Sequence, residues 1–296
     1  MSLTSLLKYR DIKTKFKQTF PKPRLIVNKT LLAPPLTNHY LLTGTAFDYL
    51  MRFYLKYLNP KAISFRWVAE IAQLETFSLL KFEYDIDEDK LINHTFSEDK
   101  KIIKTSKKIL AKAKDNYKKF LMTGRMSKNL IRSALLLAQL DPLYRGGYVD
   151  EYILDNFGIV DDKDIKDLKN LISLVDPKIF KARKVCLLNP TFGKASEMVG
   201  GADTDLVLDD MIIDIKTTKN FQLTRDFFNQ LIGYYVLYKI GGINKLPLRH
   251  DIRRLGIYYA RYGYLYLINP QDIMDDKSLR KFIQWFKKRT SGKTYI

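Results

Sequence analysis

Two short apolar runs flank a pair of aspartates in the last third of the chain. The runs are Leu206–Leu208 and Met211–Ile213, and the aspartates between them are Asp209 and Asp210. Apolar segments of this length around a polar turn are typical of a β-hairpin. A turn centred on the two aspartates pairs Leu208 with Met211 and Leu206 with Ile213.

The same register predicts which side chains share a face of the hairpin, because side chains alternate along a strand. Asp205 is expected opposite Asp214, and Asp203 opposite Lys216, with all four side chains on one face. The other face is expected to form core, through Leu206, Leu208, Met211, Ile213 and Ile215.

Hydrophobic periodicity predicts several helices and a second hairpin around this one. Helices are expected over residues 4–18, 45–58, 98–122, 128–140, 162–175, 224–239 and 278–289, the second of them capped by Thr43. Strands are expected over 184–188, over 197–201 leading into the first hairpin, and over 255–260 and 264–268 as a second hairpin. The pattern therefore predicts an α/β fold with a mixed sheet.

The net charge of the chain indicates a class of binding partner. The chain has 296 residues, 51 lysines and arginines against 32 aspartates and glutamates, and a formal net charge of +19. Such an excess indicates a polyanionic partner, most simply nucleic acid, although an anionic membrane surface or the lysine-rich composition that an AT-rich genome produces would also account for it. The single cysteine and the lack of a signal peptide or membrane span in the sequence favour a cytoplasmic protein.

Several basic side chains are candidates for contacting nucleic-acid phosphates. The 98–122 helix carries a lysine-rich face, which is either a solvated surface or a phosphate-binding one. The candidates are Lys104 and Lys108 on that helix, Lys219 and Arg225 after the first hairpin, and Arg253 and Arg254 before the second.

Facing carboxylates destabilise a strand pair unless a cation neutralises them. Mg²⁺ or Mn²⁺ suits such oxygen ligands, and Lys216 lies within reach of the same place, where it could orient a water on the ion or stabilise charge on a phosphate. The alternative is a charged hairpin edge facing solvent. The convergence of four charged side chains favours a metal site.

These residues resemble a known motif. Asp205 followed by Asp214-Ile215-Lys216 is similar to the D…(D/E)xK signature of the PD-(D/E)xK nuclease superfamily, and Gly201–Leu206 resembles the form found in its RecB-like branch. Gln230–Tyr234 matches the QxxxY motif of that branch. Gly44–Asp48 lies where the branch has a histidine motif, with Asp48 in the histidine's place.

The resemblance implies a restriction-endonuclease-like fold, a mixed sheet flanked by helices. Residues 44–60 and 185–296 would form this core, 1–43 an N-terminal helix and basic arm, and 61–184 a large helical insertion. It also implies a catalytic set of Asp205, Asp214, Lys216, Gln230 and Tyr234, with Asp205 and Asp214 holding Mg²⁺ or Mn²⁺ and help from Asp203 or Asp48.

The leading hypothesis is a metal-dependent deoxyribonuclease, with DNA favoured over RNA as substrate. Two alternatives stay open. One is a non-catalytic nucleic-acid-binding protein that keeps the nuclease fold. The other is a nuclease subunit that is active only with a protein partner, bound through the helical insertion.

Overall fold

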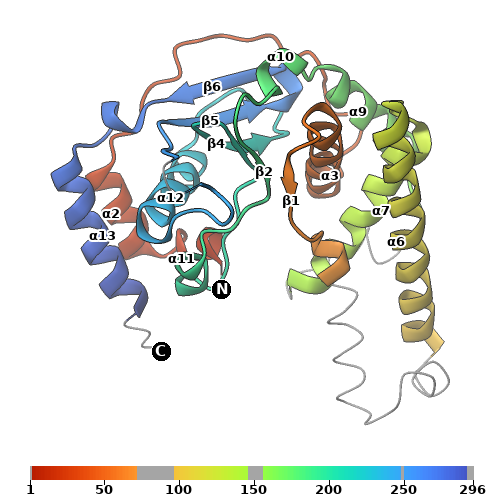
Figure 1. Ribbon diagram of the computed structural model, residues 1–296, viewed down its shortest axis with the longest axis horizontal. Helices are drawn as coiled ribbons and strands as arrows, with labels where there is room; N and C mark the ends of the chain where they lie inside the picture. The colour runs from red at the N-terminus through yellow and green to blue at the C-terminus, as the bar shows by residue number, and fades with distance from the viewer. Residues whose placement is uncertain (1, 72–96, 146–155, 248–249, 292–296) are drawn as a thin grey trace. The chain divides into compact units, whose positions relative to one another are not determined.

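The computed structural model describes residues 2–71, 97–145, 156–247 and 250–291 (Figure 1). By internal packing, the chain divides into two compact units. The sheet unit comprises Met1–Leu32, Asn59–Phe65 and Asp176–Ile296, and the helical unit comprises Ala33–Leu58 and Arg66–Val175.

The sheet unit contains a six-stranded mixed sheet in the order β1-β2-β3-β4-β5-β6. The strands are β1 (Ile63–Ser64), β2 (Cys186–Leu188), β3 (Leu206–Leu208), β4 (Met211–Lys216), β5 (Arg254–Tyr259) and β6 (Tyr264–Ile268). The pairs β1–β2 and β4–β5 are parallel, whereas the other neighbouring pairs are antiparallel. The predicted α/β class with a mixed sheet is confirmed.

Both predicted hairpins are present, and the first has the predicted register. Leu206 pairs with Ile213 and Leu208 with Met211. Asp209 has a φ of 49°, a left-handed turn conformation that aspartate tolerates better than most residues. The second hairpin joins β5 to β6 through the 3₁₀ turn η1 (Ala260–Tyr262) and Gly263.

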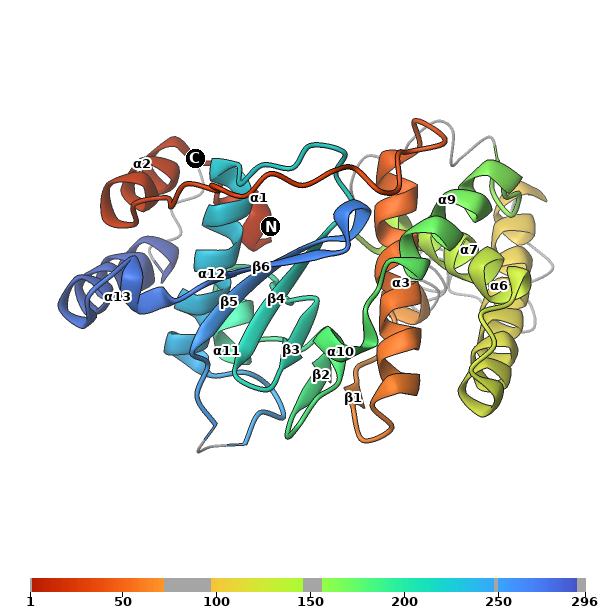
Figure 2. The ribbon, with the colours of Figure 1, turned by 90° about the horizontal axis from the view of Figure 1, so that it is seen from above.

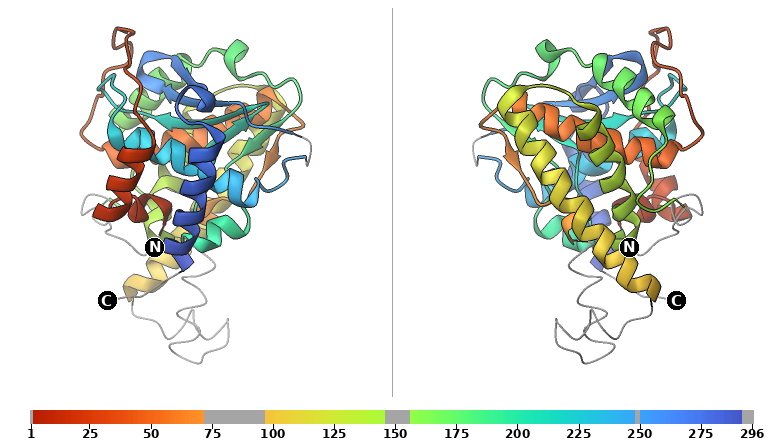
Figure 3. Two further views of the ribbon diagram at one scale, coloured as in Figure 1. Left: turned by 90° about the vertical axis from the view of Figure 1, so that its left-hand side faces the viewer. Right: turned by 90° about the vertical axis from the view of Figure 1, so that its right-hand side faces the viewer.

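Most helices of the sheet unit pack in one core cluster against one face of this sheet. They are α1 (Leu3–Leu6), α2 (Arg10–Thr19), α10 (Pro177–Phe180), α11 (Lys194–Met198), α12 (Arg225–Gly241) and α13 (Asp276–Ser291), with the 3₁₀ turn η2 (Pro270–Asp272) before α13. Figure 3 shows α2 and α13, red and blue, side by side. Phe16 and Phe282 join these two helices edge to face, with ring centroids 5.0 Å apart.

Helix α12 makes the crossover from β4 to the parallel strand β5, as parallel pairing requires. Its N-cap is Thr224, whose side chain accepts a hydrogen bond from the Phe227 N–H, and its C-cap is Gly242, with a φ of 72°. It contacts β4 and β5 along one face of the sheet (Figure 2). Val207 and Ile212 are fully buried in the core cluster that includes this helix.

The helical unit is built from α3 (Tyr40–Leu58), α6 (Ser97–Thr123), α7 (Lys128–Arg145) and α9 (Asp162–Ser173). Helix α3 contacts each of the other three. Its packing explains why residues 44–58, which we expected beside the sheet, belong to this unit. Residues 61–65 and 176–184 were expected in the helical insertion, but they belong to the sheet unit, since β1 pairs with β2.

Two local predictions are wrong. Residues 197–201 do not form a strand: α11 reaches Met198, and Gly200 and Gly201 follow with positive φ values. Thr43 is not a helix cap, because α3 already begins at Tyr40 and Thr43 is buried within it. In the described part of the chain, none of the helices combines the length and apolar character needed to cross a membrane.

Candidate functional site

Asp214 is the most buried charged residue of the predicted site. It lies near the end of β4, on the face covered by α12, and its side chain is 1% exposed. The ammonium of Lys216, two residues on and therefore on the same face, lies 2.7 Å from Asp214 Oδ2. The contact is an ion pair without the alignment of a hydrogen bond.

Burial dominates the electrostatics of Asp214. Desolvation raises the pKa of its carboxyl above the usual value, and the charge of Lys216 opposes this rise without cancelling it. Burial thus favours the neutral form of this carboxyl even with Lys216 beside it. A divalent ion there would act in the same sense as Lys216.

A hydrogen-bonded chain runs from the lysine into α12. The ammonium of Lys216 donates to Gln230 Oε1 at 3.0 Å, and the Gln230 amide donates to the Tyr234 hydroxyl at 2.7 Å. Gln230 and Tyr234 are four residues apart, so one helical face presents both. The Phe227 ring lies under the ammonium at 5.1 Å, and Phe192 stacks on Tyr234. The structure therefore brings together Asp214, Lys216, Gln230 and Tyr234.

Two further carboxylates approach this chain. Burial raises the pKa of Tyr234 far above its usual value, and the charges of Asp214, Asp205 and Asp203 raise it further. Asp203, Asp205 and Asp214 therefore all contribute to the electrostatic environment of the Tyr234 hydroxyl.

Beyond Leu206 the expected cross-strand pairs are wrong. The β3–β4 ladder stops at Leu206 and Ile213. The side chain of Asp205 takes the place of the next backbone acceptor, since its Oδ2 accepts the Ile215 N–H at 2.6 Å. Asp203 forms a backbone bridge with Thr191, and Lys216 pairs with Tyr259 on β5.

Two residues outside the predicted catalytic set, Asn189 and Thr204, hold this end of the hairpin. Asn189, just after β2, donates its amide to Asp203 Oδ2 at 3.1 Å. Thr204 is fully buried, and its hydroxyl lies 3.4 Å from the Ile213 carbonyl. Thr204 lies within the matched motif, but nothing in the sequence spacing indicated Asn189.

The residues of the site could offer a magnesium-type ion two carboxylate ligands, with water completing its coordination. In the described ranges, no group of three or more His, Cys, Asp or Glu side chains is placed to hold a metal. Asp205 and Asp214 are the two carboxylates that could serve, and Mg²⁺ commonly binds through one or two carboxylates while keeping several waters. The buried Oδ2 of Asp214, whose counter-ion is a lysine, supports this assignment.

Asp48, the fourth proposed ligand, belongs to the helical unit. Its Oδ2 lies 2.7 Å from the guanidinium of Arg52, one turn further along α3. The ion pair gives Asp48 a structural role within its own helix. Asp48 and the carboxylates of Asp203, Asp205 and Asp214 thus belong to different units.

The predicted phosphate-binding residues have different environments. Lys219, Lys104, Lys108 and Arg253 are exposed, the lysines of α6 lying in the helical unit. Arg225 is half-buried and donates to the Phe20 carbonyl at 3.0 Å, and burial lowers its pKa. The guanidinium of Arg254 is paired with the carboxylate of Asp210. Arg225 and Arg254 are therefore already engaged within the protein.

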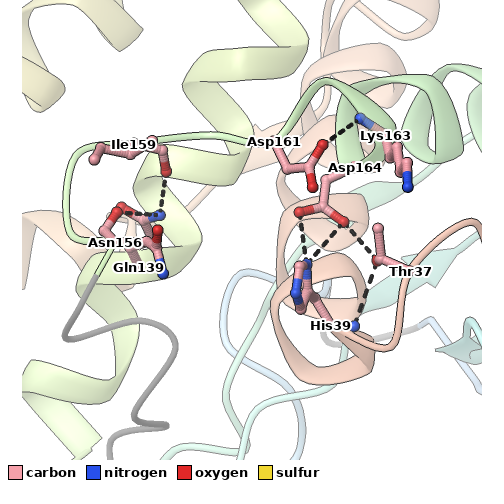
Figure 4. Close-up of polar contacts among 8 residues, drawn as sticks. All are labelled: Thr37, His39, Gln139, Asn156, Ile159, Asp161, Lys163 and Asp164. Carbon is pink, nitrogen blue, oxygen red and sulfur yellow. Dashed lines mark hydrogen bonds and ion pairs between the residues drawn. The ribbon is translucent and has the colours of Figure 1, made fainter.

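The helical unit has a polar cluster of its own, which joins the start of α3 to α9 (Figure 4). Asp164 is 1% exposed; it accepts a hydrogen bond from the Thr37 hydroxyl at 2.6 Å, and its Oδ2 lies 2.9 Å from His39 Nδ1. On α7, Gln139 binds the Ile159 carbonyl and the Gly158 N–H. These contacts fix loops to helices, and His39 accordingly has a structural role.

Comparisons of the whole chain with protein-family models, with curated proteins and with solved structures find no match. The functional interpretation therefore depends on the geometry described above and on the motifs.

Proposed function

We propose that this protein is a metal-dependent deoxyribonuclease that hydrolyses phosphodiester bonds. The observation that carries the proposal is the connected chain of Asp214, Lys216, Gln230 and Tyr234, with the carboxylates of Asp205 and Asp203 beside it. The RecB-like motif needs these residue types, and here they lie in contact across β4 and α12.

Asp205 and Asp214 would hold Mg²⁺ or Mn²⁺, with Asp203 in support through its contact with Asn189. When bound, such an ion would acidify water and neutralise phosphate charge. The ammonium of Lys216 forms an ion pair with Asp214 and donates a hydrogen bond to Gln230. A remaining ammonium hydrogen can hold a water or a phosphate oxygen, while Gln230, fixed by Tyr234, keeps the ammonium in place.

We also propose that the sheet unit has the restriction-endonuclease-like fold. Support comes from its mixed sheet, from acidic residues at the open end of a central hairpin, and from the helix that follows β4. The net charge of +19 supports a nucleic-acid substrate, with DNA proposed over RNA. A protein partner bound by the helical unit is a further possibility that co-purification would test.

A cleavage assay tests the proposal. The purified protein is incubated with closed circular DNA, with end-labelled linear DNA and with RNA, in a series of Mg²⁺ and Mn²⁺ concentrations. Cleavage of DNA that stops on chelation is expected. Asp214→Ala and Lys216→Ala should each lower the rate by about 100-fold or more, as the loss of a residue that stabilises the transition state does.

Asp226→Ala is the matched control, since this α12 aspartate is 75% exposed and pairs only with Lys13 among the described residues. It should cut like the parent. The proposal fails if no nucleic acid is cut with either metal, or if Asp214→Ala cuts as fast as the parent.

One observation favours a second candidate, a nucleic-acid-binding protein without catalysis. The Asp214 side chain is only 1% exposed, and Lys216 already neutralises it. A protein of this kind would bind DNA in a salt-dependent way, would not cut it, and would bind equally well with and without chelator.

A further inference from the structure

The turn end of the β3–β4 hairpin borders a second polar site, separate from the acidic cluster. A pocket of about 660 Å³ is bounded there by the hairpin turn, by α10 and the loop after it, and by the segment that leads into β5. Six cationic side chains line it: Lys178, Lys181, Arg183, Lys184, Arg253 and Arg254. We call this site the turn-end pocket.

The carboxylates of the turn-end pocket are engaged within the protein. Asp209 accepts hydrogen bonds from three successive backbone N–H groups, those of residues 183–185, at 2.7–3.1 Å. Asp210 accepts from the guanidinium of Arg254. Asp251 accepts from the Tyr238 hydroxyl at 3.3 Å. Each acid therefore has an internal partner.

Most of the cations, in contrast, are directed to solvent. Lys178, Arg183, Lys184 and Arg253 are exposed, and within the described residues no ion pair joins any of these four to a carboxylate. They come from separate segments, but Asp209 fixes the loop that carries Arg183 and Lys184. The Arg253 N–H is likewise bonded to the Asp210 carbonyl, at 2.8 Å. Cations gathered in this way raise the local concentration of anions.

The geometry points to a phosphate-binding site, and we propose that the turn-end pocket holds the sugar–phosphate backbone of a nucleic-acid strand. Arginine forks and lysine ammonium groups are the usual phosphate donors of proteins. Cations spread over several segments suit a chain of phosphates better than a single one. Nucleic acid as ligand follows the proposed function, but the binding site itself requires no catalysis.

The test measures binding without cleavage, by the fluorescence anisotropy of labelled duplex and single-stranded DNA in excess chelator. The triple variant Arg183→Ala/Lys184→Ala/Arg253→Ala should weaken binding about tenfold or more at moderate salt. It should also lower the slope of log Kd against log salt by about 2–3, as the loss of three phosphate contacts predicts.

The matched control removes the same charge elsewhere in the sheet unit. Lys281, Lys287 and Lys288 are exposed on α13, and their triple alanine variant should lose much less affinity. Thermal melts of both variants should match the parent, since only exposed side chains change. Equal losses in the two variants would show diffuse attraction to the whole charged surface and overturn the proposal.

Competition distinguishes the source of the phosphate. Inorganic phosphate and a nucleoside monophosphate should displace the labelled DNA only weakly. If either binds tightly while DNA binding is unchanged in the triple variant Arg183→Ala/Lys184→Ala/Arg253→Ala, the pocket serves a small phosphate compound and the proposal is wrong. Because chelator suppresses metal-dependent cleavage, a protein that fails as a nuclease can still pass this test.

Discussion

The two ends of the β3–β4 hairpin hold aspartates in opposite electrostatic environments. At the open end, burial raises the pKa of Asp214. At the turn, burial acts against Asp209, but the N–H groups of residues 183–185 and the charge of His250 together lower its pKa. Hydrogen bonds from Arg254 lower the pKa of Asp210 as well.

The comparison shows that the number of donors, rather than the residue type, sets the role of each carboxylate. Asp209 and Asp210 have enough donors to remain charged and to fix the chain around them. Asp214 has a single cation beside it and little water. A carboxylate with that environment stabilises the fold poorly but is suited to binding an added cation.

The largest expected effect comes from removing the cation at the open end. Lys216→Met leaves the buried Asp214 carboxylate without a counter-ion, which should cost about 3 kcal/mol of unfolding free energy near pH 8. Arg254→Met is the matched change at the turn, where Arg254 is 39% and Asp210 29% exposed. It should cost less than about 1 kcal/mol, because solvent screens the pair. Urea denaturation measures the loss of unfolding free energy in both variants.

The double variant Asp214→Asn/Lys216→Met separates the charge from the packing of the lysine. It should recover most of the stability lost in Lys216→Met, since no buried charge then remains. If Lys216→Met lowers the unfolding free energy no more than Arg254→Met does, the proposed electrostatic difference between the two ends of the hairpin is wrong.

A smaller effect is expected from the carboxylate at the turn. Asp209→Ala removes the acceptor of three backbone N–H groups and places alanine at a φ of 49°. Allowing for partial exposure, the cost should be about 2 kcal/mol at neutral pH. Asp209→Asn keeps an acceptor oxygen and tolerates the turn, so it should cost less.

The pH dependence of the unfolding free energy tests whether the charged Asp209 carboxylate causes this stability loss. The pKa of Asp209 is lowered in the folded protein, so its stabilisation is present above the usual value of 3.8 and is lost as the pH falls through the folded pKa. The difference in unfolding free energy between the parent and Asp209→Ala should therefore become smaller at acidic pH. A difference that is constant with pH would assign the effect to backbone strain alone.

Local patterns predicted the parts of the fold that depend on them. Apolar runs on both sides of Asp209–Asp210 predicted the register of the first hairpin, and apolar runs around Gly263 predicted the second. The contact of Gln230 with the site agrees with what the motif implied. Each of these features depends on residues close together along the chain.

The failures share a different cause, since they depend on contacts between distant segments. Asp205 ends the ladder by using its side chain as an acceptor, which alternation cannot anticipate. Packing against other helices places α3 in the helical unit. The turn-end pocket draws its cations from segments about 70 residues apart in the sequence, so no single basic run indicated it.

A further effect is expected on the pH dependence of stability in Asp214→Asn, studied without metal. The pKa of Asp214 is raised in the folded protein, so the parent is favoured below the usual value of 3.8 and loses that advantage as the pH rises through the folded pKa. Relative to the asparagine variant, the parent should lose about 1.4 kcal/mol for each unit by which the pKa is raised.

Magnesium should act against this loss above the folded pKa of Asp214, where the carboxylate is charged. Added Mg²⁺ should raise the melting temperature of the parent and leave Asp214→Asn nearly unchanged, because the ion binds the folded protein through the carboxylate. Asp210→Asn, the matched change at the turn, should keep the response of the parent. An equal response of the parent and Asp214→Asn would show that Mg²⁺ binds elsewhere. The open end would then hold only a buried ion pair.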